Sequence, residues 1–146
     1  MKLPTIKRLL CNAFLLAALA LGATDASAEL VVVVSSKSAI SSLTAAQVAR
    51  IFLGKTGSYP GGGNAVPLDQ AEGSEIRNEF YLRVTGKSAS QLRAYWAKII
   101  FAGDGQPPRI LQNSEEVKQE LSRNPDAIGY IDRSALNGNF RVVLTP

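Results

Sequence analysis

The sequence predicts a single α/β domain, and three observations lead to this fold class. A continuous run of apolar, mostly β-branched residues at 30–34 is typical of a strand that is covered on both faces of a sheet. Two capping boxes, each followed by apolar residues at helical spacing, mark helices further along the chain. Strands and helices alternate at the start, which favours a mixed or largely parallel sheet with helices on its faces.

The first 28 residues carry the pattern of a secretory signal peptide. The segment begins with basic residues, continues with an apolar stretch over residues 14–21 and ends in the small-x-small pattern Ala26-Ser27-Ala28. We therefore expect cleavage before Glu29 and a single mature domain over residues 29–146. A membrane anchor is the alternative, but a spanning helix needs about 20 apolar residues and this stretch is shorter.

Composition excludes several classes of function. Cys11 precedes the apolar stretch, whereas lipid attachment needs a cysteine just after it, so we expect neither a lipoprotein nor a disulfide. Removal of residues 1–28 takes away three of 16 basic and one of 12 acidic residues, which leaves 13 against 11. This small net charge favours neither nucleic acid nor stable membrane insertion. The chain has no histidine, so we expect no enzyme, no catalytic residues, no metal site and no cofactor.

The expected elements run in the order strand, helix, strand, three helices, strand, strand. A capping box at residues 44–47 opens the first helix, which Gly54 ends. The other expected elements are a strand over 65–68, helices over 74–85, 88–102 and 113–123, and strands over 127–131 and 140–144. The glycine-rich segment 61–63 can in general cradle phosphate, but it lacks the P-loop pattern, so a surface turn is the preferred interpretation.

One junction between a strand and a helix carries a candidate binding site. The strand ends at Leu68, the turn contains Gly73, and Ser74 begins the helix. Free backbone amides at a helix N-terminus, beside a glycine that lets a ligand approach, form an anion site. The Ser74 hydroxyl adds a donor, and Glu72 could accept a hydrogen bond from hydrogen phosphate but not from sulfate. The alternative is structural: Ser74 caps the helix and Glu75 complements its dipole.

Five segments, taken in order, point to a known family. They are Ser42-Leu43-Thr44, Val48-Ala49-Arg50-Ile51-Phe52-Leu53-Gly54-Lys55, Val66-Pro67, Glu72-Gly73-Ser74 with Arg77, and Pro125-Asp126-Ala127-Ile128-Gly129-Tyr130. Together they resemble the second lobe of periplasmic phosphate-binding proteins of ABC transporters, and more closely the short single-lobe proteins grouped with them. The resemblance implies an α/β fold that is a single lobe of the type 2 periplasmic binding protein, with a mixed sheet and helices on both faces.

The resemblance also implies a set of ligand-binding residues. The family's phosphate motif is an arginine, any residue, an acid, glycine, serine, glycine and threonine. The implied ligand-binding residues, with Arg77 added as the nearby cation, are Gln70, Glu72, Gly73, Ser74 and Arg77.

This chain departs from the family motif in ways that weaken the site. Gln70 stands in place of the arginine, and Glu75 and Ile76 replace the last glycine and threonine. The first lobe is missing. Asp69, together with Glu72 and Glu75, sets three negative charges against one positive, so a dianion meets net repulsion.

Two functions therefore remain open. The resemblance implies a periplasmic protein of ABC-type phosphate uptake or sensing that binds phosphate or a related oxyanion weakly. The alternative is a periplasmic interaction module with a decayed ligand site, which contacts an envelope protein or a second copy of itself.

We expect the aromatic pairs at residues 80–81 and 95–96 to pack in the core or on a lobe face. A solvated face is expected for the basic residues Arg77, Arg83, Lys87, Arg93 and Lys98.

Overall fold

The computed structural model describes residues 29–146, and the predicted signal peptide lies outside the described residues. The elements are β1 (Leu30–Ser35), α1 (Ala45–Phe52), β2 (Val66–Gln70), α2 (Glu75–Thr85), α3 (Ala89–Ala102), β3 (Arg109–Leu111), α4 (Ser114–Arg123), β4 (Ala127–Asp132), a 3₁₀ turn (Arg133–Ala135) and β5 (Phe140–Leu144). Within this described part, every helix is too short or too polar to cross a membrane.

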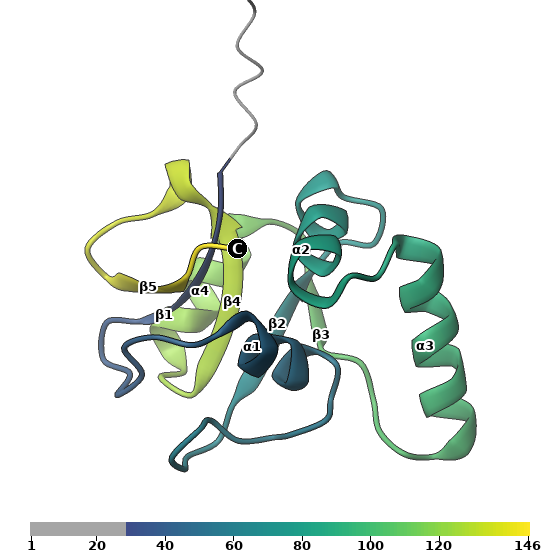
Figure 1. Cartoon of the computed structure of the whole chain (residues 1–146). Helices are drawn as coiled ribbons and strands as arrows, with labels where there is room; N and C mark the ends of the chain where they lie inside the picture. The colour runs from purple at the N-terminus through teal and green to yellow at the C-terminus, as the bar shows by residue number, and fades with distance from the viewer. Residues whose placement is uncertain (1–28) are drawn as a thin grey trace, which may run out of the picture.

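The sheet is mixed, with the strand order β3-β2-β4-β1-β5 (Figure 1). Strand β2 runs parallel to both β3 and β4. Strand β1 is antiparallel to both of its neighbours, β4 and β5. The carboxyl ends of the three parallel strands therefore meet at one edge of the sheet, where a ligand site is expected in this class of fold.

Helices cover both faces of the sheet, as predicted. Val32 and Val34 of β1 point into a core shared with α1, α2 and α3, whereas Val31 and Val33 point into a second core under α4. All four valines are fully buried. This two-sided burial explains why β1 reads as a continuous apolar run rather than an alternating one.

Two expectations about the elements are wrong. Strand β2 does not end at Leu68 but continues through Asp69 and Gln70, which are both buried. The helices from α2 to α4 are not consecutive, because the short strand β3 separates α3 from α4. Three residues after a pair of prolines are too few to show an alternating pattern, so β3 leaves little signal in the sequence.

Both predicted capping boxes are confirmed, at Thr44 with Gln47 and at Ser88 with Gln91. Helix α3 lies at the side of the molecule, away from β1 and β5 (Figure 1). Its contacts reach the end of α1: the Tyr95 hydroxyl donates to the carbonyl of Leu53 at 2.6 Å.

Helix α4 lies close against the sheet because β4 carries a glycine at the point of contact. A Cβ on Gly129 would lie 2.6 Å from Cγ1 of Val117, closer than real Cβ atoms come. The backbone of β4 is thus in direct contact with the side chain of Val117. A glycine is required at position 129 because any side chain would clash there, and not because the backbone has an unusual φ.

We predict that Gly129→Ala destabilises the protein by about 1–3 kcal/mol, since the added methyl overpacks the contact with Val117. Urea unfolding measures the effect. Gly138→Ala is the matched control, because a Cβ at Gly138 meets nothing within 4 Å. Equal stability of the two variants would contradict the close contact between α4 and β4.

Candidate functional site

Helix α2 begins at the carboxyl edge of the parallel strands with unpaired backbone donors. The turn after β2 is closed by the Ser74 amide, which donates to the carbonyl of Ala71 at 3.1 Å, and Gly73 adopts φ of 84°. The first bond into the helix is from the Asn78 amide to the carbonyl of Ser74. Within the described part of the chain, the amides of residues 75–77 have no acceptor.

Ser74 is the N-cap residue of α2, as predicted, but its side chain does not cap the helix. The hydroxyl oxygen is buried and has no hydrogen-bond partner among the described residues. A buried hydroxyl without a partner is unfavourable, and most are paired in folded proteins. The structural alternative, in which the Ser74 hydroxyl satisfies the helix start, is therefore wrong.

The neighbouring helix α4 begins at the same edge but is closed. The Asn113 side chain accepts from the amide of Glu116 at 3.0 Å, and two acids, Glu115 and Glu116, occupy the first turn. The Ser114 hydroxyl oxygen lies 3.4 Å from the side-chain nitrogen Nε2 of Gln70 and also 3.4 Å from the backbone nitrogen of Asp132. The start of α2 has one acid, Glu75, in its first turn and no side-chain cap, so it is more open to an anion than the start of α4.

A buried carboxylate lies directly beneath the α2 turn. Asp69 is 1% exposed and receives donors on both oxygens. Its Oδ2 accepts from Nε of Arg77 at 3.1 Å and from the hydroxyl of Tyr81 at 2.9 Å. Its Oδ1 accepts from the hydroxyl of Tyr130 and, at 2.8 Å, from the amide of Gln70. The carboxylate is thus saturated by four donors from β2, α2 and β4.

The protonation states of this network follow from its burial. Desolvation, and then the charge of Asp69, raise the pKa of Tyr81 and of Tyr130 above the ordinary value of 10.0. Both hydroxyls therefore stay protonated and donate. Burial alone would lower the pKa of Arg77, but the adjacent Asp69 carboxylate outweighs it, so the pKa is raised and the guanidinium stays charged.

The five predicted ligand residues are divided between the surface and the interior. Glu72, Gly73 and Ser74 lie together in the turn, where Glu72 is exposed and 3.8 Å from Nη1 of Arg93 on α3. Gln70 is 2% exposed, and its side-chain amide donates to the carbonyl of Tyr130 at 2.7 Å, so it is not free to contact a ligand.

Arg77 is the clearest departure from expectation. It is 6% exposed and paired with Asp69, so the prediction of a solvated side chain is wrong for it. Its two terminal nitrogens donate to no group in the described residues. Its pairing with Asp69 cancels one of the three negative charges counted around the turn, but it also uses the one positive charge counted with them. The long, exposed pair of Glu72 with Arg93 reduces the remaining repulsion of an anion only slightly.

Sequence reasoning missed the role of Asp69 and its partners. One signal was present: Arg77 and Tyr81 are four residues apart, so they share a helical face with the predicted core residue Phe80. An arginine on a buried face requires a carboxylate partner. The contribution of Tyr130 had no local signal, because it lies 61 residues from Asp69.

We predict that Asp69→Asn destabilises the fold by about 3–5 kcal/mol, because it leaves the buried Arg77 without its counter-charge. Thermal or urea unfolding followed by circular dichroism measures this loss. Glu79→Gln is the control, since it breaks the exposed pair with Arg83 at 2.6 Å and costs less than about 1 kcal/mol. Equal stability of the two variants would contradict the contribution of the Asp69 network to the free energy of unfolding.

We predict that stability falls as the pH rises above 10. The unfolded chain releases the protons of Tyr81 and Tyr130 near pH 10.0, whereas the folded protein retains them because their pKa values are raised. Each group then contributes up to about 1.4 kcal/mol of loss per pH unit. Urea unfolding from pH 9 to about pH 11 should show a smaller loss in Tyr81→Phe than in the wild type. Identical losses in both proteins would contradict a raised pKa for Tyr81.

Three solved structures are similar in fold to this chain. A candidate phosphate ABC transporter substrate-binding protein from Clostridium perfringens, with bound phosphate, matches with a TM-score of 0.64 at 22% identity, over 79% of this chain and 44% of that chain. An ABC-type phosphate transport receptor from Vibrio cholerae matches with a TM-score of 0.62 at 16% identity, over 79% of this chain and 45% of that chain. PstS from Borrelia burgdorferi matches with a TM-score of 0.52 at 15% identity, over 72% of this chain and 40% of that chain.

The likeness at these identities is one of fold. No protein-family model matches the sequence, and no curated protein matches it. The chain spans less than half the length of each of the three solved proteins. The described residues therefore form a single lobe of the periplasmic binding-protein fold, as the sequence predicts.

Proposed function

We propose that the protein is a periplasmic lobe that binds phosphate or a related oxyanion weakly at the N-terminus of α2. The observation that carries the proposal is the start of this helix, where three backbone amides and the Ser74 hydroxyl have no partner among the described residues. These groups offer four donors at the positive end of a helix dipole. The likeness in fold to proteins that bind phosphate supports the same ligand class.

Several features make the affinity low. The Ser74 hydroxyl oxygen is buried, so an anion reaches it only after neighbouring atoms move aside. Gln70 and the Nε of Arg77 are already bonded within the protein. Micromolar binding corresponds to about −8 kcal/mol, and the few neutral donors at the start of α2 supply only part of this, so we expect a Kd in the millimolar range.

Glu72 supports a preference for phosphate over sulfate. At neutral pH hydrogen phosphate has an O–H group that can donate a hydrogen bond to a carboxylate, whereas sulfate has none. The pair of Glu72 with Arg93 is long, at 3.8 Å, and both side chains are more than half exposed. Such a pair is worth little, so Glu72 is free to turn to a ligand at low cost.

We place the protein in phosphate uptake or sensing by an ABC-type system, after export through the predicted signal peptide. The alternative function, a periplasmic interaction module with a decayed site, is favoured by one observation: Gln70 and Arg77, two of the five implied ligand residues, serve the interior. Calorimetry separates the two functions, because only the first requires heat on addition of phosphate.

We predict that Ser74→Ala weakens phosphate binding about tenfold, as expected for loss of one hydrogen bond to a charged ligand. Stability should not fall, because the hydroxyl makes no capping bond. The measurement is calorimetric titration of protein from a periplasmic extract with phosphate and with sulfate. Mass spectrometry of the same sample reports whether residues 1–28 are present.

The matched control is Ser88→Ala at the start of α3, where the hydroxyl accepts from the Gln91 amide at 3.3 Å. This change should cost about 1 kcal/mol of stability and leave phosphate binding intact. The proposal is refuted if the wild type gives no heat at tens of millimolar phosphate, or if Ser74→Ala and Ser88→Ala bind phosphate equally well.

A further inference from the structure

A small polar pocket lies between helix α1 and the loop that follows this helix. Its volume is about 190 Å³. Helix α1 contributes Gln47 and Arg50, which are three residues apart and therefore lie on one face of the helix. The loop contributes Thr56 and Ser58. None of the described residues that line the pocket is acidic, so it combines one positive charge with neutral polar groups.

The charge of Arg50 is not neutralised within the described part of the chain. The ion pairs between residues 29 and 146 use other side chains, and the guanidinium makes no hydrogen bond there. Asp126, an acid near the same loop, lines a different pocket. Arg50 is exposed, so its charge is available to a ligand. A guanidinium can bind a carboxylate through two parallel hydrogen bonds, and a single cation favours a ligand with one negative charge.

The neutral polar groups of the pocket can donate to the same anion. The Oε1 of Gln47 accepts from the Thr44 amide at 2.9 Å in the capping box, and this bond fixes the orientation of the side chain. Its Nε2 has no acceptor among residues 29–146. The hydroxyl oxygens of Thr56 and Ser58 lie 3.3 Å apart, and this contact uses the proton of only one of them. The pocket therefore offers an amide and a hydroxyl donor beside the guanidinium.

An apolar groove adjoins this pocket, because Ile51 and Thr56 line both. The groove has a volume of about 300 Å³. Most of its lining is apolar and includes Ala65, Val66, Pro67, Pro107 and Pro108. Arg109 also lines the groove, but it pairs with Glu120 at 3.4 Å, so its charge is already offset. Apolar walls beside a few convergent polar groups are typical of sites for small molecules.

We propose that the polar pocket and the groove together bind a small organic carboxylate. Its carboxylate group contacts Arg50, and its apolar body lies in the groove beyond Ile51. The charge of the pocket and the apolar walls of the groove favour this ligand over inorganic phosphate, which has no apolar body. One exposed cation and an open groove bind weakly, so we expect a Kd on the order of 0.1–1 mM. The site is separate from the α2 turn, because the groove borders the start of β2 and Ser74 follows its other end.

The test is an NMR titration of the isotope-labelled protein with hexanoate, with its neutral analogue hexanamide and with acetate. Hexanoate should shift the amide signals of residues 50–58, and the other two compounds should bind at least about tenfold more weakly. Arg50→Gln removes the cation and should raise the Kd of hexanoate at least about tenfold, with little effect on hexanamide. Arg123→Gln is the matched control, because Arg123 is likewise exposed in the last turn of its helix, and it should bind hexanoate as the wild type does.

Gly57→Gln tests the groove, which Gly57 lines. A Cβ at this position meets nothing within 4 Å, so the new side chain fits, occupies part of the groove and should raise the Kd of hexanoate several-fold. Circular dichroism confirms that each variant is folded.

The proposal is overturned if hexanoate causes no shift at tens of millimolar, or if Arg50→Gln and Arg123→Gln bind it equally well. Equal affinity for hexanoate and acetate, or an unchanged Kd in Gly57→Gln, overturns the placement of the apolar body in the groove. Phosphate should not compete with hexanoate, and Ser74→Ala should bind hexanoate normally. A failure at this site is therefore distinguishable from a failure at the α2 turn.

Discussion

A single buried carboxylate, that of Asp69, holds helix α2 in place on the sheet. It joins the end of β2 to two successive turns of α2, through Arg77 and Tyr81, and to the adjacent strand β4, through Tyr130. A buried charge without these donors would cost several kcal/mol, so the helix has one favourable position in which all of them reach. The ring of Tyr130 also stacks on Phe80 at 4.0 Å, which ties the same network to the apolar core.

This use of Arg77 has a consequence for ligand binding. The one cation close to the α2 turn in sequence neutralises a protein carboxylate, so an incoming anion meets mainly neutral donors from the backbone and from Ser74. Neutral donors at a helix end bind anions less strongly than a paired guanidinium does. The interaction that fixes the position of the helix start is thus also the reason that we expect weak binding at the proposed site.

The sequence predicts the fold better than it predicts the site, and the difference lies in the range of the interactions. Capping boxes and the apolar run of β1 are local, so α1, α3 and the two-sided sheet can be read directly. The three residues of β3 have no local pattern, and the extension of β2 to Gln70 depends on partners elsewhere. The site residues Glu72, Gly73 and Ser74 adjoin one another along the chain, and their common turn could be predicted. The inward direction of Arg77 could not, because it depends on Asp69 lying in a strand rather than in a loop.

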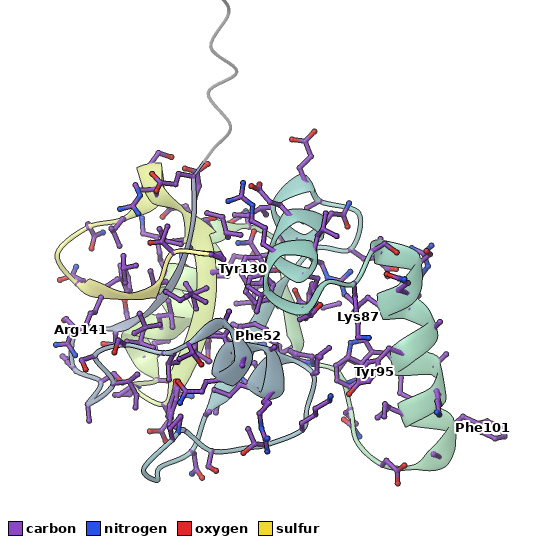
Figure 2. The ribbon with its side chains drawn as sticks, viewed as in Figure 1. Phe52, Lys87, Tyr95, Phe101, Tyr130 and Arg141 are labelled. Carbon is purple, nitrogen blue, oxygen red and sulfur yellow. The ribbon has the colours of Figure 1, made fainter. Side chains whose placement is uncertain are left out.

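The two ends of β2 differ in the chemistry that they expose. At the carboxyl end, the start of α2 offers the backbone amides of residues 75–77, which have no acceptor among the described residues. At the amino end lies a mostly apolar groove lined by residues such as Ile51, Val66 and Pro107, and the ring of Phe101 on the neighbouring helix α3 is exposed to solvent (Figure 2). Because β2 is a rigid strand within the sheet, covering one end does not obstruct the other. An anion at the α2 turn would therefore leave the apolar groove at the other end of β2 unchanged.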